Sequence, residues 1–221
     1  MLKVSWGWFL AMAMLACVAR AQEPAPGAHE VVNDATQKVM AVVAESGEYL
    51  DTDPERYYQQ VQDILDPVID FRGFARSVMG PYASSKRYRS LDEAGRQQLR
   101  DQLDAFTEVM RVGLVRTYSK GLLAYGDSRI EVFAAAEEDV ARGRAAVRQL
   151  VYNNQPEPYV LIYHMGLANS GEWQLRNIII EGVNLGEIYR SQFEASARKN
   201  GGDIDAVIAS WTAVEVEPEE S

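Results

Sequence analysis

The chain has 221 residues with a single cysteine, and its 32 Asp and Glu residues outnumber 22 Lys and Arg, which makes the formal net charge −10. A strongly acidic protein is repelled by nucleic-acid phosphates and by bare anionic membranes, so the charge argues against both as direct ligands and against stable membrane insertion. The length is enough for one large domain, or two small ones, with a substantial core.

The N-terminus is organised like a secretory signal peptide. Lys3 precedes an uncharged, largely apolar run over residues 4–18, and Ala19-Arg20-Ala21 supplies the small residues of an A-x-A cleavage site. The run is shorter than the roughly 20 residues that span a bilayer comfortably. We therefore predict a signal peptide at 1–21. A retained membrane anchor and lipoprotein processing at Cys17 are the alternatives.

Cleavage there removes the only cysteine and two basic residues, so the formal charge of the mature chain becomes −12. Without a disulfide, the mature protein depends on packing alone for stability. We predict one domain over residues 22–213, a disordered acidic tail over 214–221, and a location in the Gram-negative periplasm.

Apolar residues in the first half of the chain recur at helical spacing, and capping or helix-breaking residues separate the runs. A possible capping box at Thr52-x-x-Glu55 starts the second run, and Ser90-x-x-Glu93 is expected to cap the longest one. The pattern predicts helices over residues 31–47, 54–65, 71–79 and 91–118.

The periodicity then changes to that of strands. Runs rich in β-branched and aromatic residues, separated by turn sequences, predict strands at Ile130–Phe133, Arg144–Tyr152, Tyr159–Met165 and Glu172–Glu181. Two short helices, Leu185–Ala197 and Asp203–Trp211, complete the chain. Short links between consecutive strands favour an antiparallel meander, so we predict an α+β fold with a curved four-stranded sheet wrapped by long helices.

Residues that carry catalytic or metal chemistry are scarce. The two histidines are far apart: His29 is expected to be solvated and His164 lies within a predicted strand. The sequence has no zinc-ligand spacing, nucleophile elbow, phosphate-binding loop or dinucleotide fingerprint. Asp70 is a possible general base, but a helix cap is the favoured interpretation. The acidic cluster 137–139 is expected to be a solvated loop, with weak calcium binding as an alternative. We assign no catalytic residue, metal site or cofactor.

Large apolar and aromatic side chains are abundant on the faces that should point inward. Such residues form either a plain hydrophobic core or the wall of an apolar pocket, and Met is suited to both because it fills irregular space. The residues that we predict to bind an apolar ligand are Phe71, Phe74, Val78, Met79, Phe106, Met110, Leu114, Tyr118, Leu122, Val147, Val151, Val160, Ile162, Trp173 and Leu175. If so, charged substitutions at Val147 or Ile162 should abolish ligand retention and leave the fold intact.

The C-terminal region carries a family resemblance. Residues 173–185 read WQLRNIIIEGVNL, and YRSQF follows at 189–193. Together they resemble W-K-V-x-D-V-x-V-E-G-V-S-L followed by Y-R-S-Q-F, the hallmark of the MlaC family of periplasmic phospholipid-binding proteins, also called toluene-tolerance auxiliary proteins. The segment DFRGFARSVMG at 70–80 and Thr117-Tyr118 also resemble family features. The chain departs from the family pattern at Asn177 and Asn184.

The resemblance implies an NTF2-like α+β fold with an all-helical portion and an apolar pocket for phospholipid acyl chains. It implies a monomeric, non-enzymatic shuttle whose cargo is phospholipid. Its expected partners are an outer-membrane lipoprotein–porin complex and an inner-membrane ABC transporter complex, and its role is to maintain outer-membrane lipid asymmetry. The alternatives are an NTF2-like enzyme that uses Asp70, Tyr163 or His164, and an envelope chaperone that binds polypeptide.

Overall fold

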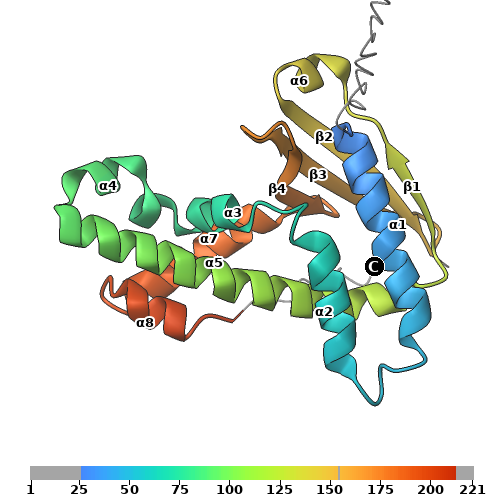
Figure 1. The fold of residues 1–221 in the computed structure, drawn as a ribbon, viewed down its shortest axis with the longest axis horizontal. Coiled ribbons are helices and arrows are strands. Elements are labelled where there is room, and N and C mark those ends of the chain that lie inside the picture. The colour runs from blue at the N-terminus through green and yellow to red at the C-terminus, as the bar shows by residue number, and fades with distance from the viewer. Residues whose placement is uncertain (1–25, 154, 213–221) are drawn as a thin grey trace, which may run out of the picture.

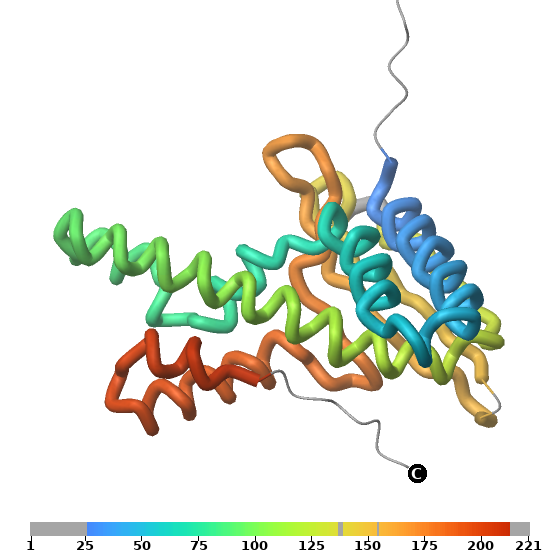
Figure 2. Tube along the Cα trace, turned by 60° about the horizontal axis from the view of Figure 1, so that its bottom comes forward, coloured from blue at the N-terminus to red at the C-terminus, as the bar shows by residue number. Residues whose placement is uncertain are grey.

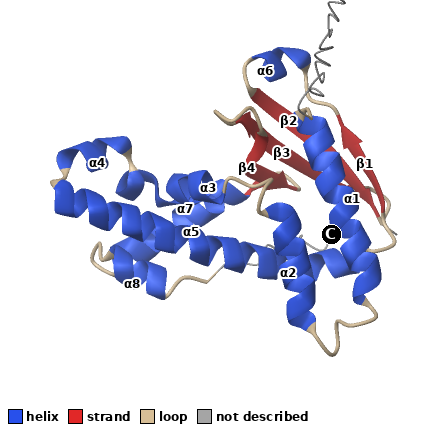
Figure 3. Cartoon of the chain, in the orientation of Figure 1, coloured by secondary structure: helices blue, strands red, loops and turns tan. Residues whose placement is uncertain are grey.

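The computed structural model describes residues 26–153 and 155–212. The predicted signal peptide (1–21) and acidic tail (214–221) lie outside the described residues and stay predictions. The described part is an α+β structure in which helices cover one face of an antiparallel sheet (Figures 1 and 3). The α+β class predicted from the sequence is therefore confirmed.

The helices include all those predicted from the apolar periodicity and two short additional ones. Their bounds are α1 Ala28–Ser46, α2 Pro54–Leu65, α3 Phe71–Met79, α4 Ser85–Ser90, α5 Glu93–Leu122, α6 Glu137–Ala141, α7 Leu185–Lys199 and α8 Ile204–Ala209. The turns Gly80–Ala83 and Leu123–Tyr125 are 3-10 helices. Two predicted caps are corrected, because Asp53 rather than Thr52 caps α2 and Asp92 rather than Ser90 caps α5.

The sheet has five strands in sequential order, β1 Arg129–Phe133, β2 Arg144–Tyr152, β3 Tyr159–Leu167, β4 Trp173–Ile180 and β5 Val183–Asn184. The prediction of four strands is wrong because β5 was missed. This strand pairs with the end of β4 across a two-residue turn, Glu181-Gly182, in which both residues have positive φ. A two-residue strand is too short to show the alternation from which strands are recognised.

Side chains alternate between the two faces of the sheet. On β2, Ala145, Val147, Gln149 and Val151 are buried beneath the helices. Their pairing with Met165, Tyr163, Leu161 and Tyr159 of β3 puts the odd-numbered residues of both strands on the same face. Val160 and Ile162 consequently lie on the opposite face.

The helices form two groups around this sheet. Helix α1 lies across one face of the sheet, and α2 lies beside it (Figure 1). A helical arm, made of α3, α4, α7, α8 and the N-terminal part of α5, extends away from the sheet (Figure 2). Its core is aromatic, with Phe106 packed edge-on against Phe193 and Trp211 at ring-centroid distances of 4.9 and 5.0 Å. The arm therefore has its own packed core, which borders the space between helices and sheet at Phe74 and Leu185.

Candidate functional site

A cavity of about 490 Å³ lies between the sheet and the helices that cover it. Its walls come from α1, the C-terminal half of α5, the segment joining α2 to α3, and strands β1 to β4. Most of the lining is apolar, and it includes Val32, Ala35 and Val39 of α1, Leu114 and Leu122 of α5, and Leu161, Ile178 and Ile180 of the sheet. The volume falls within the range of roughly 300–1,000 Å³ that is typical of small-molecule sites.

The cavity is long as well as apolar. Along β3 its wall runs from Tyr159 to Met165, and at about 3.3 Å per residue these six steps span roughly 20 Å. One leaflet of a bilayer contributes about half of a hydrocarbon core that is some 30 Å thick. The cavity is therefore long enough to hold an extended acyl chain.

Several uncharged polar groups of the wall have local hydrogen-bond partners, whereas the buried Ser119 hydroxyl has none among the described residues. Thr36 donates a hydrogen bond of 3.0 Å to the side-chain oxygen of Gln149, which is 5 % exposed. Burial raises the pKa of Tyr163, which keeps its hydroxyl neutral. The Tyr57 hydroxyl donates a hydrogen bond of 2.7 Å to the carbonyl oxygen of Ser119 and so links α2 to the part of α5 that lines the cavity. The wall suits an apolar ligand because these groups add no charge.

Arg176 is the one charged residue among the described residues that line the cavity. Its guanidinium forms an ion pair with Asp70, which is itself the N-cap of α3 and accepts a hydrogen bond from the Gly73 N–H at 2.9 Å. The backbone N–H of Asp70 also donates to the carbonyl oxygen of Leu175 at 3.0 Å. The capping role predicted for Asp70 is confirmed, and the ion pair holds the start of α3 against β4.

The residues considered for an enzyme do not converge on a reactive centre. The Asp70 carboxylate is occupied by the cap and the ion pair, and the Tyr163 hydroxyl is held neutral. His164 is opposite Asn177 and Ala146 in the sheet, so it faces away from Tyr163 and the cavity. His29, expected to be solvated, is half-buried with its ring nitrogen 3.0 Å from the Val132 carbonyl oxygen.

Neither a metal-binding cluster nor a membrane-spanning helix is found in the part of the chain that the structure covers. Over residues 26–153 and 155–212, no three His, Cys, Asp or Glu side chains are grouped closely enough to hold a metal ion. Among those same residues, every helix is too short or too polar to span a membrane.

Comparison with known proteins identifies the family. The model of the MlaC protein family matches residues 33–213. The chain belongs to the MlaC family. Toluene tolerance protein ttg2D of Pseudomonas putida is 30% identical over 183 residues, which cover 83% of this chain and 79% of that protein. The resemblance seen in residues 173–193 is thereby confirmed.

The fold also matches a solved structure. A phospholipid-binding protein from Ralstonia solanacearum, determined in complex with a phospholipid, aligns with a TM-score of 0.66 at 23% identity. The alignment covers 83% of this chain and 98% of that one. The arrangement of sheet and helices described above is thus shared with that protein.

Of the fifteen residues predicted to bind an apolar ligand, seven line this cavity. They are Phe71, Phe74, Leu114, Tyr118, Leu122, Val151 and Leu175. The other eight lie outside the lining. Val78, Met79, Phe106 and Met110 pack in the core of the helical arm, Val147 and Trp173 pack between α1 and the sheet, and Val160 and Ile162 lie on the opposite sheet face. Periodicity identifies a buried face, but it does not show whether that face meets another side chain or a void.

Sequence reasoning also missed parts of the wall. Val32, Ala35 and Val39 of α1 line it, and their i, i+3, i+7 spacing was a usable signal. Ile178 and Ile180 were missed because β4 contains a β-bulge. Leu175 pairs with Met165, but the next pair joins Asn177 to His164, so Arg176 is an extra residue in β4. The extra residue reverses the alternation of side chains, so the cavity-facing residues of β4 are odd-numbered before the bulge (Leu175) and even-numbered after it (Ile178 and Ile180).

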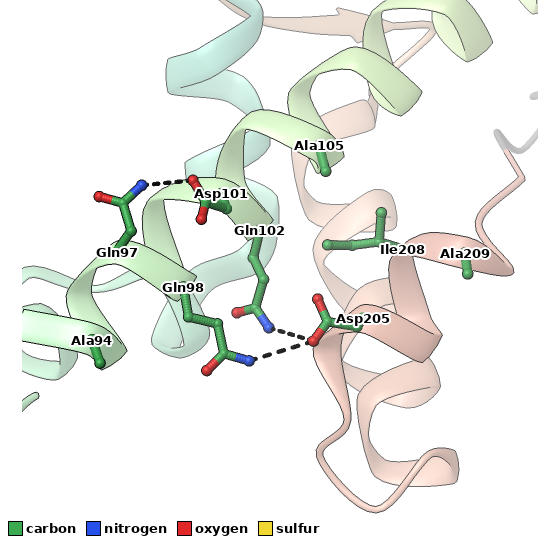
Figure 4. A pocket seen from close by; sticks show the side chains of 9 residues that line it. All are labelled: Ala94, Gln97, Gln98, Asp101, Gln102, Ala105, Asp205, Ile208 and Ala209. Carbon is green, nitrogen blue, oxygen red and sulfur yellow. Dashed lines mark hydrogen bonds between the residues drawn. The ribbon is translucent and has the colours of Figure 1, made fainter.

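A second, open hollow lies between α5 and α8 (Figure 4). Gln98 and Gln102 both donate to Asp205, at 3.5 and 3.1 Å, and Gln97 donates to Asp101 at 2.8 Å. Alanines form much of the remaining surface, as Figure 4 shows. Its polar groups are hydrogen-bonded to one another, and we assign it no ligand.

Proposed function

We propose that this protein binds glycerophospholipid and carries it through the periplasm. The observation that carries the proposal is the apolar cavity of about 490 Å³ enclosed by α1, α5 and the sheet. Membership of the MlaC family supports the proposal, as does the shared fold with a phospholipid-binding protein. The predominantly apolar lining adds a physical reason, since it favours a hydrocarbon ligand over a polar substrate.

The energetics of lipid transfer explain why a closed container is needed. Burying a methylene is worth about 0.8 kcal/mol, so a lipid with about 30 methylenes loses more than 20 kcal/mol on exposure to water. A carrier must therefore replace most of that burial throughout the crossing. Release requires a partner that favours an opened cavity or offers a competing apolar surface, because a carrier with one closed state would retain its lipid.

The finer proposal concerns the place of this carrier in the envelope. We infer that it acts as a monomer, without catalysis, between an outer-membrane lipoprotein–porin complex and an inner-membrane ABC transporter complex, and that it maintains outer-membrane lipid asymmetry. Family membership supports these partners and the periplasmic location. We also propose that the fold is NTF2-like, which an antiparallel sheet with helices packed on one face supports.

Native mass spectrometry of the protein exported with its own leader tests this function. The mature N-terminus is expected at Gln22, with a mass excess of intact phospholipid of mixed headgroups that denaturation releases. As a control, solvent-delipidated protein is mixed with phosphatidylethanolamine vesicles and should regain the same excess. A lipid-free mass with no uptake from vesicles would reject the carrier function, and co-purified peptides would indicate a chaperone instead.

A further inference from the structure

We propose that the Tyr163 hydroxyl donates a hydrogen bond to an ester carbonyl oxygen of the bound lipid, at the position where an acyl chain is joined to glycerol. This inference rests on the proposed function and adds a polar contact to a ligand so far described by its chains. The starting observation is that Tyr163 lines the cavity, while its hydroxyl has no hydrogen-bond partner among the described residues. The hydroxyl of a buried tyrosine usually has such a partner, so its absence calls for an explanation.

The register of the sheet directs Tyr163 toward the cavity. The residue lies on β3, the central strand of the five, and pairs with Val147 of β2 and Ile178 of β4. Residues that pair across neighbouring strands point to the same face of a sheet. Val147 is fully buried beneath the helices and Ile178 lines the cavity, so the ring of Tyr163 rises from the middle of the cavity floor.

The surroundings of the ring are apolar. Tyr163 packs against the cluster that contains Val32 of α1 and Met165 of β3. Burial raises the pKa of its hydroxyl, and no charged or hydrogen-bonding neighbour contributes to this rise. The residue is nevertheless only partly buried, whereas Val147 beside it is fully buried. A side chain that is desolvated and yet not fully packed has its remaining surface in an internal space, which here is the cavity.

The other uncharged polar side chains that the sheet contributes to the wall have partners among the described residues. They are Gln149, Tyr159 and Asn177. On α5, Ser119 also lacks a partner for its hydroxyl, but this oxygen has almost no accessible surface, so a ligand cannot contact it. Tyr163 therefore combines an unbonded hydroxyl with a surface that a ligand can reach.

An ester carbonyl is the acceptor that suits this position. Acyl chains alone would displace water from the hydroxyl and leave it unsatisfied, which is unfavourable. A phosphate group carries a charge whose burial among apolar side chains is costly, whereas an ester carbonyl is a neutral acceptor attached directly to the chain. Recognition of the ester is indifferent to the headgroup. Free fatty acid offers the same carbonyl chemistry in its carboxyl group, so the experiment has to separate the two sources.

The test mixes delipidated mature protein with vesicles that contain equal amounts of phosphatidylethanolamine and its diether analogue, which has the same headgroup and chain lengths but no ester carbonyls. Native mass spectrometry resolves the two bound lipids by mass. Wild-type protein should bind the diester lipid in about 3- to 10-fold excess, which is the range of a single neutral hydrogen bond. Tyr163→Phe keeps the ring and removes the donor, so it should bind both lipids equally.

Tyr152→Phe is the matched control. The Tyr152 hydroxyl donates to Glu131 at 3.1 Å, and the residue lies on the other face of β2 from the buried Val151. This variant should keep the wild-type preference for the diester lipid.

Infrared spectroscopy of lipid with isotope-labelled ester carbonyls gives a second readout. The carbonyl band should lie at lower frequency in wild-type protein than in Tyr163→Phe, because a hydrogen bond weakens the C=O bond. The wild-type lipid preference tests the proposal even if Tyr163→Phe fails to fold. Oleic acid added to the vesicles should not displace the diester lipid.

The outcomes separate the two proposals. Wild-type protein without a preference, or Tyr163→Phe with an undiminished one, would overturn the ester contact while the carrier function stands. Equal loss of both lipids in Tyr163→Phe would assign the hydroxyl to the fold or to the phosphate, and displacement by oleic acid would assign it to a fatty acid; either result overturns the contact. Wild-type protein that takes up neither lipid would reject the carrier function itself.

Discussion

Leu161→Glu places a carboxylate inside the cavity with little disturbance of the sheet. Leu161 lines the cavity from the middle of β3, where it pairs with Gln149 of β2 and Ile180 of β4. Its side chain is only half-buried, so water can hydrate a carboxylate at this position when the cavity holds no lipid. We therefore expect the variant to fold and to melt close to the wild-type temperature.

An acyl chain in the cavity would remove that water and leave the carboxylate facing hydrocarbon. Burial of this kind raises the pKa of a carboxyl, and the cost of protonating it at pH 8 is about 5 kcal/mol. Lipid affinity should accordingly fall roughly 10³- to 10⁴-fold at pH 8. The loss should shrink as the pH falls toward 5, because less free energy is then needed to protonate the group in the loaded protein.

Uptake of phosphatidylethanolamine from vesicles by delipidated protein, measured by native mass spectrometry at pH 8 and pH 5, checks this prediction. Ile162→Glu is the control, because the neighbouring residue lies on the other face of β3 and outside the cavity lining. It should take up lipid like wild type, contrary to the expectation drawn from the sequence pattern alone. Equal loss in both variants, or full uptake by Leu161→Glu at pH 8, would refute the cavity as the lipid site.

Three further predictions concern residues behind or beyond the cavity. Val147 is fully buried between α1 and the sheet, so Val147→Asp should unfold the protein, seen as loss of its thermal transition. Phe106→Ala should destabilise the helical arm by about 3–5 kcal/mol in urea unfolding and leave lipid affinity unchanged, since Phe106 does not line the cavity. Burial raises the pKa of Tyr57 to about 12. Stability should therefore fall by roughly 3 kcal/mol as the pH rises from about 10 through 12, and Tyr57→Phe should lessen this alkaline loss in urea titrations.

Local sequence patterns determined the elements and the family. The 3.6-residue spacing of apolar positions in α1 and α5, and the alternation in β2, are short-range properties that a single stretch of chain expresses by itself. The motif at residues 173–193 was sufficient to indicate the MlaC family. Val151 and Leu175 were correctly placed facing the helices for the same reason.

Only the tertiary structure decided which buried faces meet a void. Phe106 and Leu114 occupy the same helix and carry the same signal, yet one packs against Phe193 in the arm and the other lines the cavity. The β4 bulge changed the side on which Ile178 lies, and the ion pair between Asp70 and Arg176 joins residues far apart in the chain. A cavity exists where facing elements pack incompletely, and this depends on the spacing of whole helices and strands, which no local pattern encodes.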